Sequence, residues 1–157
     1  EIFINLESYS RRTPEIKSLL VEAYKKLFLD LKAPKSAANK NPFVAAYLNT
    51  MNDQSASVSL GISPESLSIL RSRFILEWFD KYAGKYPFHL FEYEQQLMKL
   101  GLFNAYNQWV FGANMGLSAF QSWTAQHDDE YSRFINFQKG RVFKVPPGQN
   151  YHAASAK

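Results

Sequence analysis

Apolar residues recur along most of this chain at the three- and four-residue spacing that places side chains on one face of an α-helix. Three of the expected helix starts carry a polar capping residue followed directly by proline, at Thr13-Pro14, Asn41-Pro42 and Ser63-Pro64. The cap accepts a backbone N–H, and proline lacks the donor that a first turn leaves unpaired. The pattern predicts helices over residues 14–32, 42–51, 64–83, 87–101, 102–111 and 118–138.

These elements define an all-α fold. Short links between successive helices favour antiparallel neighbours, so we expect an irregular antiparallel helical bundle, or stacked helical hairpins, of roughly five to six helices. The length of 157 residues suits one domain. We assign residues 1–140 to that helical domain and 141–157 to an irregular C-terminal tail, because Pro146-Pro147-Gly148 is incompatible with regular structure.

The N-terminal segment has a different pattern. Ile2, Ile4 and Leu6 alternate with polar or aromatic neighbours, which is typical of an extended chain. We therefore predict an extended N-terminal arm over residues 1–12. A similar alternation at 141–145 predicts that this arm pairs with the C-terminal tail as a small ribbon.

The longest segment without Asp, Glu, Lys or Arg runs from Leu100 to His127. On a helical wheel of residues 102–111, the side opposite the apolar arc carries amides and one aromatic ring where a solvated face usually carries charges. Either this face is open and binds a partner, or the helix is central and its amides bond to neighbouring backbone. With the open face, the predicted binding residues are Asn104, Asn107, Gln108, Phe111, Trp123 and His127.

Three polar residues lie within apolar stripes and are predicted to be buried. His127 falls between Trp123 and Tyr131 in the stripe of the last predicted helix, and Glu94 lies between apolar groups of the helix over 87–101. A buried carboxylate needs a partner, for which we expect His127 or Arg71, itself within the apolar arc of 64–83. The alternatives are a neutral core histidine and a Glu94 that reaches outward to solvent.

Composition excludes several kinds of chemistry. The chain has no cysteine, so disulfides, thiolate metal ligands and cysteine nucleophiles are absent. No nucleophile elbow, phosphate loop or dinucleotide fingerprint occurs. The two His-x-x-Glu spacings, at His89 and His127, reverse the order that di-iron bundles use. We therefore predict no metal and no cofactor.

Charge and composition also limit the kind of partner and the compartment. The net charge of +4 is not gathered into a basic tract, which argues against nucleic acid. The amides of the uncharged run would be unsatisfied in hydrocarbon, so we expect no membrane span. Richness in Asn, Gln, Ser and Tyr, together with a first residue other than Met, favours a processed, extracytoplasmic bacterial protein.

Three functions follow from these observations. The leading hypothesis is a non-enzymatic protein–protein interaction or structural module, a component of a larger assembly, that holds a protein partner on the amide face. The alternative is a helical protein that binds a glycan or another small ligand. The second alternative is an enzyme that uses Glu94 and His127 as an acid/base pair.

Overall fold

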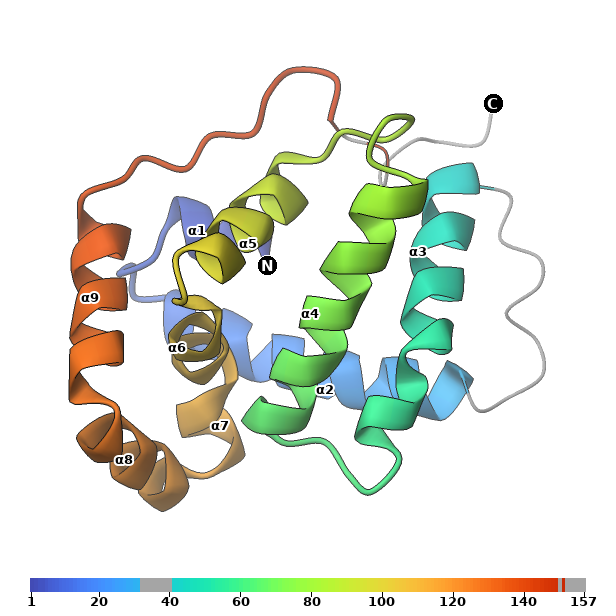
Figure 1. Cartoon of the computed structure of the whole chain (residues 1–157). Coiled ribbons are helices and arrows are strands. Elements are labelled where there is room, and N and C mark those ends of the chain that lie inside the picture. Colours follow the sequence, from blue (N-terminus) through green and yellow to red (C-terminus); the bar gives the residue numbers. More distant parts are fainter. Residues whose placement is uncertain (32–40, 150, 152–157) are drawn as a thin grey trace.

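The computed structural model describes residues 1–31, 41–149 and 151, and all regular structure in these ranges is helical, as predicted (Figure 1). These ranges hold more and shorter helices than the five to six expected. A 3₁₀-helix, η2, covers Ser55–Val58, and a π-helix, η3, covers Gln108–Gly112. The α-helices are α1 (Ile2–Leu6), α2 (Thr13–Leu31), α3 (Pro42–Asp53), α4 (Pro64–Lys81), α5 (His89–Lys99), α6 (Phe103–Asn107), α7 (Ala113–Met115), α8 (Leu117–Gln126) and α9 (Asp128–Lys139).

Two of the predicted cap-and-proline starts are confirmed. Asn41 Oδ1 accepts the backbone N–H groups of Phe43 and Val44, at 3.0 and 3.3 Å, where α3 begins. Ser63 and Ser66 cap α4 reciprocally, each hydroxyl accepting the backbone N–H of the other residue. These bonds satisfy donors that the first turn leaves without an intrahelical partner.

The N-terminal segment is not extended, which corrects the prediction for residues 1–12. α1 forms one short helix in which Glu7 N donates to Phe3 O at 2.9 Å. The predicted ribbon is also wrong, because the residues described by the structure include no strand. Without a neighbouring strand, the segment satisfies its backbone by a helical turn. The two ends still meet through side chains, since Arg141 Nη2 donates to Asn5 Oδ1 at 2.7 Å.

The later helices break at other places than predicted. The chain stays helical from Phe103 to Met115, through the π-helix, so the helix predicted over 102–111 does not end at Phe111 and Gly112 lies within it. Gly112 is instead a packing position, where an added Cβ would lie 2.5 Å from Gln108 Oε1 and from Phe120 Cδ2. The single helix predicted over 118–138 is divided at His127, whose backbone leaves the helical region at φ −123° and ψ 37°.

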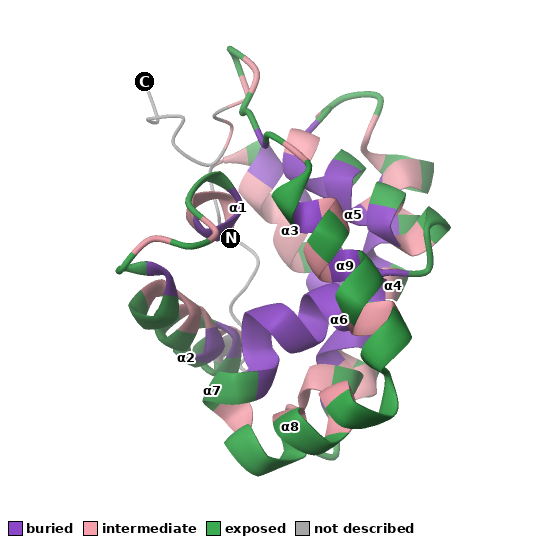
Figure 2. Ribbon diagram, turned by 90° about the vertical axis from the view of Figure 1, so that its left-hand side faces the viewer, coloured by how far each residue is buried: buried purple, intermediate pink, exposed green. Residues whose placement is uncertain are grey.

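The helices surround a core made largely of aromatic rings. α3 and α4 lie side by side, and α2 crosses them (Figure 1). α6 and η3 are buried along nearly their whole length, whereas α8 has no buried residue (Figure 2). Phe74, Trp78 and Phe91 form one compact group, with ring centroids 5.0 to 5.6 Å apart. Residues 141–149 have no helix or strand.

Candidate ligand-binding cavity

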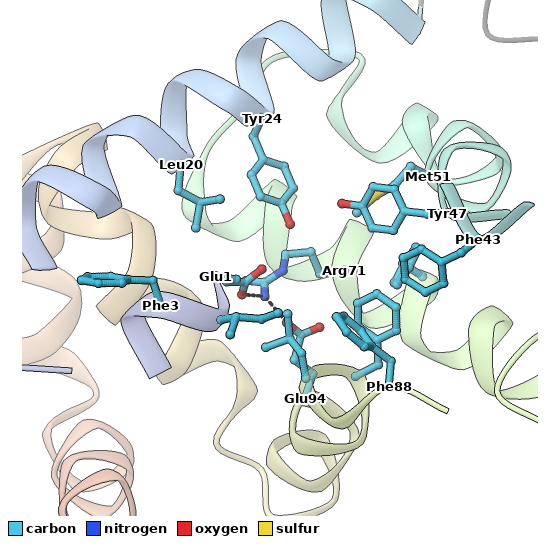
Figure 3. Close-up of a pocket in the computed structure, with 14 residues that line it drawn as sticks. Glu1, Phe3, Leu20, Tyr24, Phe43, Tyr47, Met51, Arg71, Phe88 and Glu94 are labelled. Carbon is cyan, nitrogen blue, oxygen red and sulfur yellow. Dashed lines mark hydrogen bonds and ion pairs between the residues drawn. The ribbon is translucent and has the colours of Figure 1, made fainter. Parts of the chain in front are cut away.

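A cavity of about 410 Å³ lies between α1, α2, α3, α4 and α5 (Figure 3). Most of its wall is apolar and buried, while Ile2, Phe3, Leu20 and Tyr47 are half-buried and form its more accessible side. The side chains that line it are Glu1, Ile2, Phe3, Leu20, Tyr24, Phe43, Tyr47, Met51, Arg71, Phe74, Phe88, Leu90, Phe91 and Glu94.

The polar part of the cavity is organised around Arg71 of α4. Its Nη2 donates to Glu94 Oε1 of α5 at 2.6 Å and also to Glu1 Oε1. Its Nη1 donates to Asn107 Oδ1 of α6 at 2.5 Å. The Arg71 side chain is only 2% exposed, so these acceptors replace the water that the guanidinium loses on burial.

A second layer of contacts fixes this network. Tyr106 Oη donates to Glu1 Oε1 at 3.0 Å and accepts from Asn5 Nδ2 at 2.7 Å. The Arg71 guanidinium also lies 5.2 Å from the Phe111 ring centroid. Cation–π attraction of this kind favours the charged form of a desolvated arginine. Both terminal nitrogens of Arg71 are therefore engaged by the protein itself.

The two carboxyls titrate in opposite directions. Burial raises the pKa of Glu94 to about 8, and repulsion by Glu1 adds to this rise, against the attraction of Arg71. Burial also acts on Glu1, but the attraction of nearby positive charge, Arg71 first, outweighs it and lowers the pKa of Glu1. At neutral pH Glu94 is therefore mostly protonated, and its carboxyl hydrogen-bonds the Glu1 carboxylate.

Two tyrosines complete the polar lining. Tyr24 comes from α2 and Tyr47 from α3, and Figure 3 shows both rings directed towards the space around Arg71. Burial raises the pKa of each phenol, so both stay neutral, and the two hydroxyls interact with each other. They offer neutral hydrogen-bonding groups inside a wall that is otherwise mostly apolar.

Arg71 and Glu94 are both buried, as predicted, and of the two partners left open for Glu94 the structure shows Arg71. The prediction for His127 is wrong, because the break between α8 and α9 turns it outward and leaves it exposed. Its ring stacks on Trp123 at 4.3 Å, and its Nδ1 lies 2.9 Å from Trp123 O. The structure thus joins Glu94 to Arg71 and not to His127, which removes the proposed acid/base pair.

The predicted open face is mostly core. Asn107, Gln108 and Phe111 are 0%, 4% and 0% exposed. Asn107 Nδ2 donates to Phe103 O at 2.7 Å, and Gln108 Nε2 donates to Glu65 Oε1 at 2.8 Å. The alternative of a central helix is therefore correct, although the amides bond to side chains as well as to backbone.

Asn104 and Trp123 lie differently from the rest of the predicted face. Asn104 is exposed and accepts a hydrogen bond from Ser68 Oγ at 2.6 Å, and Trp123 is half-buried. Together with Gln108 and the half-exposed Ile69, both line a separate surface cleft of about 240 Å³. Three of the six predicted binding residues are thus brought together.

Sequence reasoning missed Glu1, Tyr24 and Tyr47 as cavity residues. Tyr24 follows Leu20 by four positions in the apolar stripe of α2, a spacing that indicates burial but not the presence of a cavity. Glu1 carried no signal once its segment was taken as extended. A cavity depends on how five helices pack, which no local pattern encodes.

Two further findings concern what the protein holds. Within residues 1–31, 41–149 and 151, no three His, Asp or Glu side chains are grouped to hold a metal ion. In the same part of the chain, no helix has both the length and the apolar character needed to cross a membrane.

Comparison with protein families, curated proteins and solved structures found no match for this chain.

Proposed function

We propose that this protein is a non-enzymatic binding protein for a small, largely apolar organic molecule, which it holds in the cavity enclosed by the five helices α1 to α5. The observation that carries the proposal is the cavity itself. Its volume of about 410 Å³ lies in the range of ligand pockets, roughly 300 to 1,000 Å³. Aromatic and aliphatic walls with a few convergent polar groups are the usual composition of such pockets.

The residues around the cavity favour binding over catalysis. Its described lining includes no serine, threonine, lysine or histidine that could act as a nucleophile or a proton shuttle. Arg71, Glu1 and Glu94 are bonded to one another, so they hold a fixed arrangement before any ligand arrives. Such preorganisation reduces the cost of ordering side chains when a ligand binds.

The test uses Nile red, a neutral dye whose emission rises in apolar surroundings. We expect the wild-type protein to bind it saturably and the Leu20→Trp variant to bind it at least about tenfold more weakly, because the larger ring occupies the cavity. Leu19→Trp is the matched control, since Leu19 is 57% exposed on the same helix and lies outside the cavity. Equal binding by both variants would contradict the proposal.

A protein–protein interaction module is the second candidate, now restricted to the cleft of Asn104, Gln108, Ile69 and Trp123. What favours it is the exposed apolar surface beside polar amides at one place. Peptides selected from a displayed random library on the wild-type protein should lose binding to Ile69→Arg. They should keep binding to Leu76→Arg, which adds the same charge on the same helix outside the cleft. Equal binding to both variants would dismiss this candidate.

A further inference from the structure

We propose, building on the ligand-binding function above, that the cavity takes an organic cation: an ammonium group carried on an aromatic or aliphatic body. Three features point to this class, namely the charges of the polar cluster, the hydrogen bonds that Arg71 already makes and the rings that surround the cavity.

The side-chain charges of the cluster do not balance when every group is ionised. Among the side chains, one guanidinium, Arg71, faces two carboxyls, Glu1 and Glu94, so the ionised side chains carry one excess negative charge in a buried place. The α-ammonium of Glu1 is a further positive charge beside the cluster, and it acts on the Glu1 carboxyl, whose pKa it lowers. Without a ligand, a proton on Glu94 removes this excess. A ligand that brings one positive charge would compensate Glu94 in the same way, with the carboxyl ionised.

An anionic ligand has no comparable place. Arg71 already donates through both terminal nitrogens, to Glu94, Glu1 and Asn107. An incoming carboxylate or phosphate that bonded Arg71 would lie beside the Glu1 carboxylate, which Arg71 already holds. Like charges at such distances in a desolvated site are strongly repulsive.

The walls are suited to a cation as well as to an apolar body. Phe43, Phe74, Phe88, Phe91, Tyr24 and Tyr47 all line the cavity. Phe88 and Phe91 meet edge to face, with their ring centroids 4.9 Å apart. Ring faces carry partial negative charge and attract ammonium groups. An aromatic body on the ligand can in turn pack on the same rings.

When such a ligand binds, its ammonium group replaces the proton on Glu94 as the positive charge beside this carboxyl. The ammonium keeps its own protons, the Glu94 carboxyl loses its proton to solvent, and an ion pair between ammonium and carboxylate forms. The titratable and charged groups around Glu94 are Arg71, Tyr24, Tyr47, Tyr93, Tyr106 and Glu1, whose α-ammonium acts on the Glu1 carboxyl. Burial raises the pKa of all four phenols, so none of them ionises near neutral pH. Glu94 is therefore the source of the released proton.

The experiment uses three ligands of the same size that differ in charge: phenethylamine, phenethyl alcohol and phenylacetate. Isothermal titration calorimetry of the full chain at about pH 6.5, in phosphate and in ACES buffer, which differ in ionisation enthalpy, measures affinity and the number of protons released. We expect the amine to bind at least about tenfold more tightly than the alcohol, and phenylacetate to bind most weakly. We also expect amine binding to release about one proton and alcohol binding to release none.

Glu94→Gln supplies a second readout. The amide has the shape of the protonated acid but cannot ionise, so we expect it to lower affinity for the amine about thirtyfold while leaving the alcohol nearly unchanged. Glu92→Gln removes a carboxyl from the exposed side of the same helix and should alter neither. The proton count is measured on the wild-type protein, so the test stands even when Glu94→Gln does not fold.

The outcomes separate the two proposals. Tighter binding of the amine with release of a proton supports the organic cation. Equal or tighter binding of the alcohol or phenylacetate, or amine binding without proton release, overturns it while the cavity remains a ligand site. If Nile red binds and Leu20→Trp weakens its binding, but none of the three ligands binds, the organic-cation proposal is overturned and the ligand-binding function stands. Failure of both the dye and the series overturns the binding function itself.

Discussion

Between Leu102 and Gly112 the chain is buried at every position except Asn104, whereas α8, which begins five residues later, has no buried residue. Both segments belong to the same uncharged run. In the first, the amides have fixed partners, as when Asn107 accepts from Arg71 and Gln108 donates to Glu65. In the second, Gln121 and Gln126 are exposed to solvent. An uncharged sequence is therefore compatible with a buried helix and with an exposed one. The hydrogen-bond partners of the amide side chains distinguish the two.

The largest expected effect on stability comes from replacing Arg71, the buried cation that hydrogen-bonds Asn107 in the segment from Leu102 to Gly112. Arg71→Met leaves Glu1, Glu94 and Asn107 without their common donor, and we expect it to lower the free energy of unfolding by about 3 to 5 kcal/mol. Urea denaturation measures this. Arg133→Met on the exposed side of α9 should cost less than about 1 kcal/mol. Similar losses in both variants would mean that the Arg71 network does not stabilise the fold.

The pH dependence of stability tests the same network. The pKa of Glu94 is about 8 in the folded protein and lower when the chain unfolds, so between these values the folded state binds more protons. The contribution of Glu94 is fully present below its unfolded pKa and is lost as pH rises towards 8. We expect stability to fall between about pH 5 and 8, by up to ~1.4 kcal/mol per pH unit. Glu94→Gln should remove this slope and Glu92→Gln should keep it; a slope unchanged in Glu94→Gln would refute the assignment.

The next effect concerns packing within the two segments. Gly112→Ala places a Cβ within 2.5 Å of Gln108 and Phe120, and we expect a loss of about 1 to 3 kcal/mol. Gly116→Ala, at the start of α8, meets only Ala119 at 3.8 Å, so its stability should stay within about 0.5 kcal/mol of wild type. Thermal melting of both variants measures the difference. Tolerance of alanine at Gly112 would show that this contact is loose.

The smallest effect is expected at the exposed end of the run. His127→Ala removes the ring stacked on Trp123, and we expect a loss of less than about 1 kcal/mol because the histidine is exposed. The fluorescence of Trp123 should change, since its stacking partner is gone, while urea denaturation shows little difference. A loss in the free energy of unfolding as large as that of Arg71→Met would contradict the exposed position of His127.

Much of the fold could be predicted from the sequence because its signals are local. The caps at Asn41 and Ser63 and the apolar stripes placed α3 and α4 nearly where they lie. Arg71 and Glu94 could be recognised as candidates for burial, because a charge within an apolar stripe must either be paired or turn outward, but the partner of Glu94 stayed open between Arg71 and His127. These predictions needed only the period of the helix and the cost of burying a charge.

Other features depend on long-range packing that no local pattern carries. The break at His127 has no glycine or proline, and the stripe through Trp123 and Tyr131 continues across it. The helical turn of α1 is held by contacts of Asn5 with Tyr106 and Arg141, more than a hundred positions away. The cavity arises where five helices meet incompletely.

The most direct test of the central claim is a crystal structure of the protein grown with phenethylamine. We expect the ligand within the cavity of Figure 3, with its nitrogen at hydrogen-bonding distance from the Glu94 carboxylate and its ring against Phe43, Phe88 or Tyr47. Arg71 should keep its bonds to Glu94, Glu1 and Asn107. A cavity holding only water at saturating amine, or an amine bound elsewhere, would contradict the account.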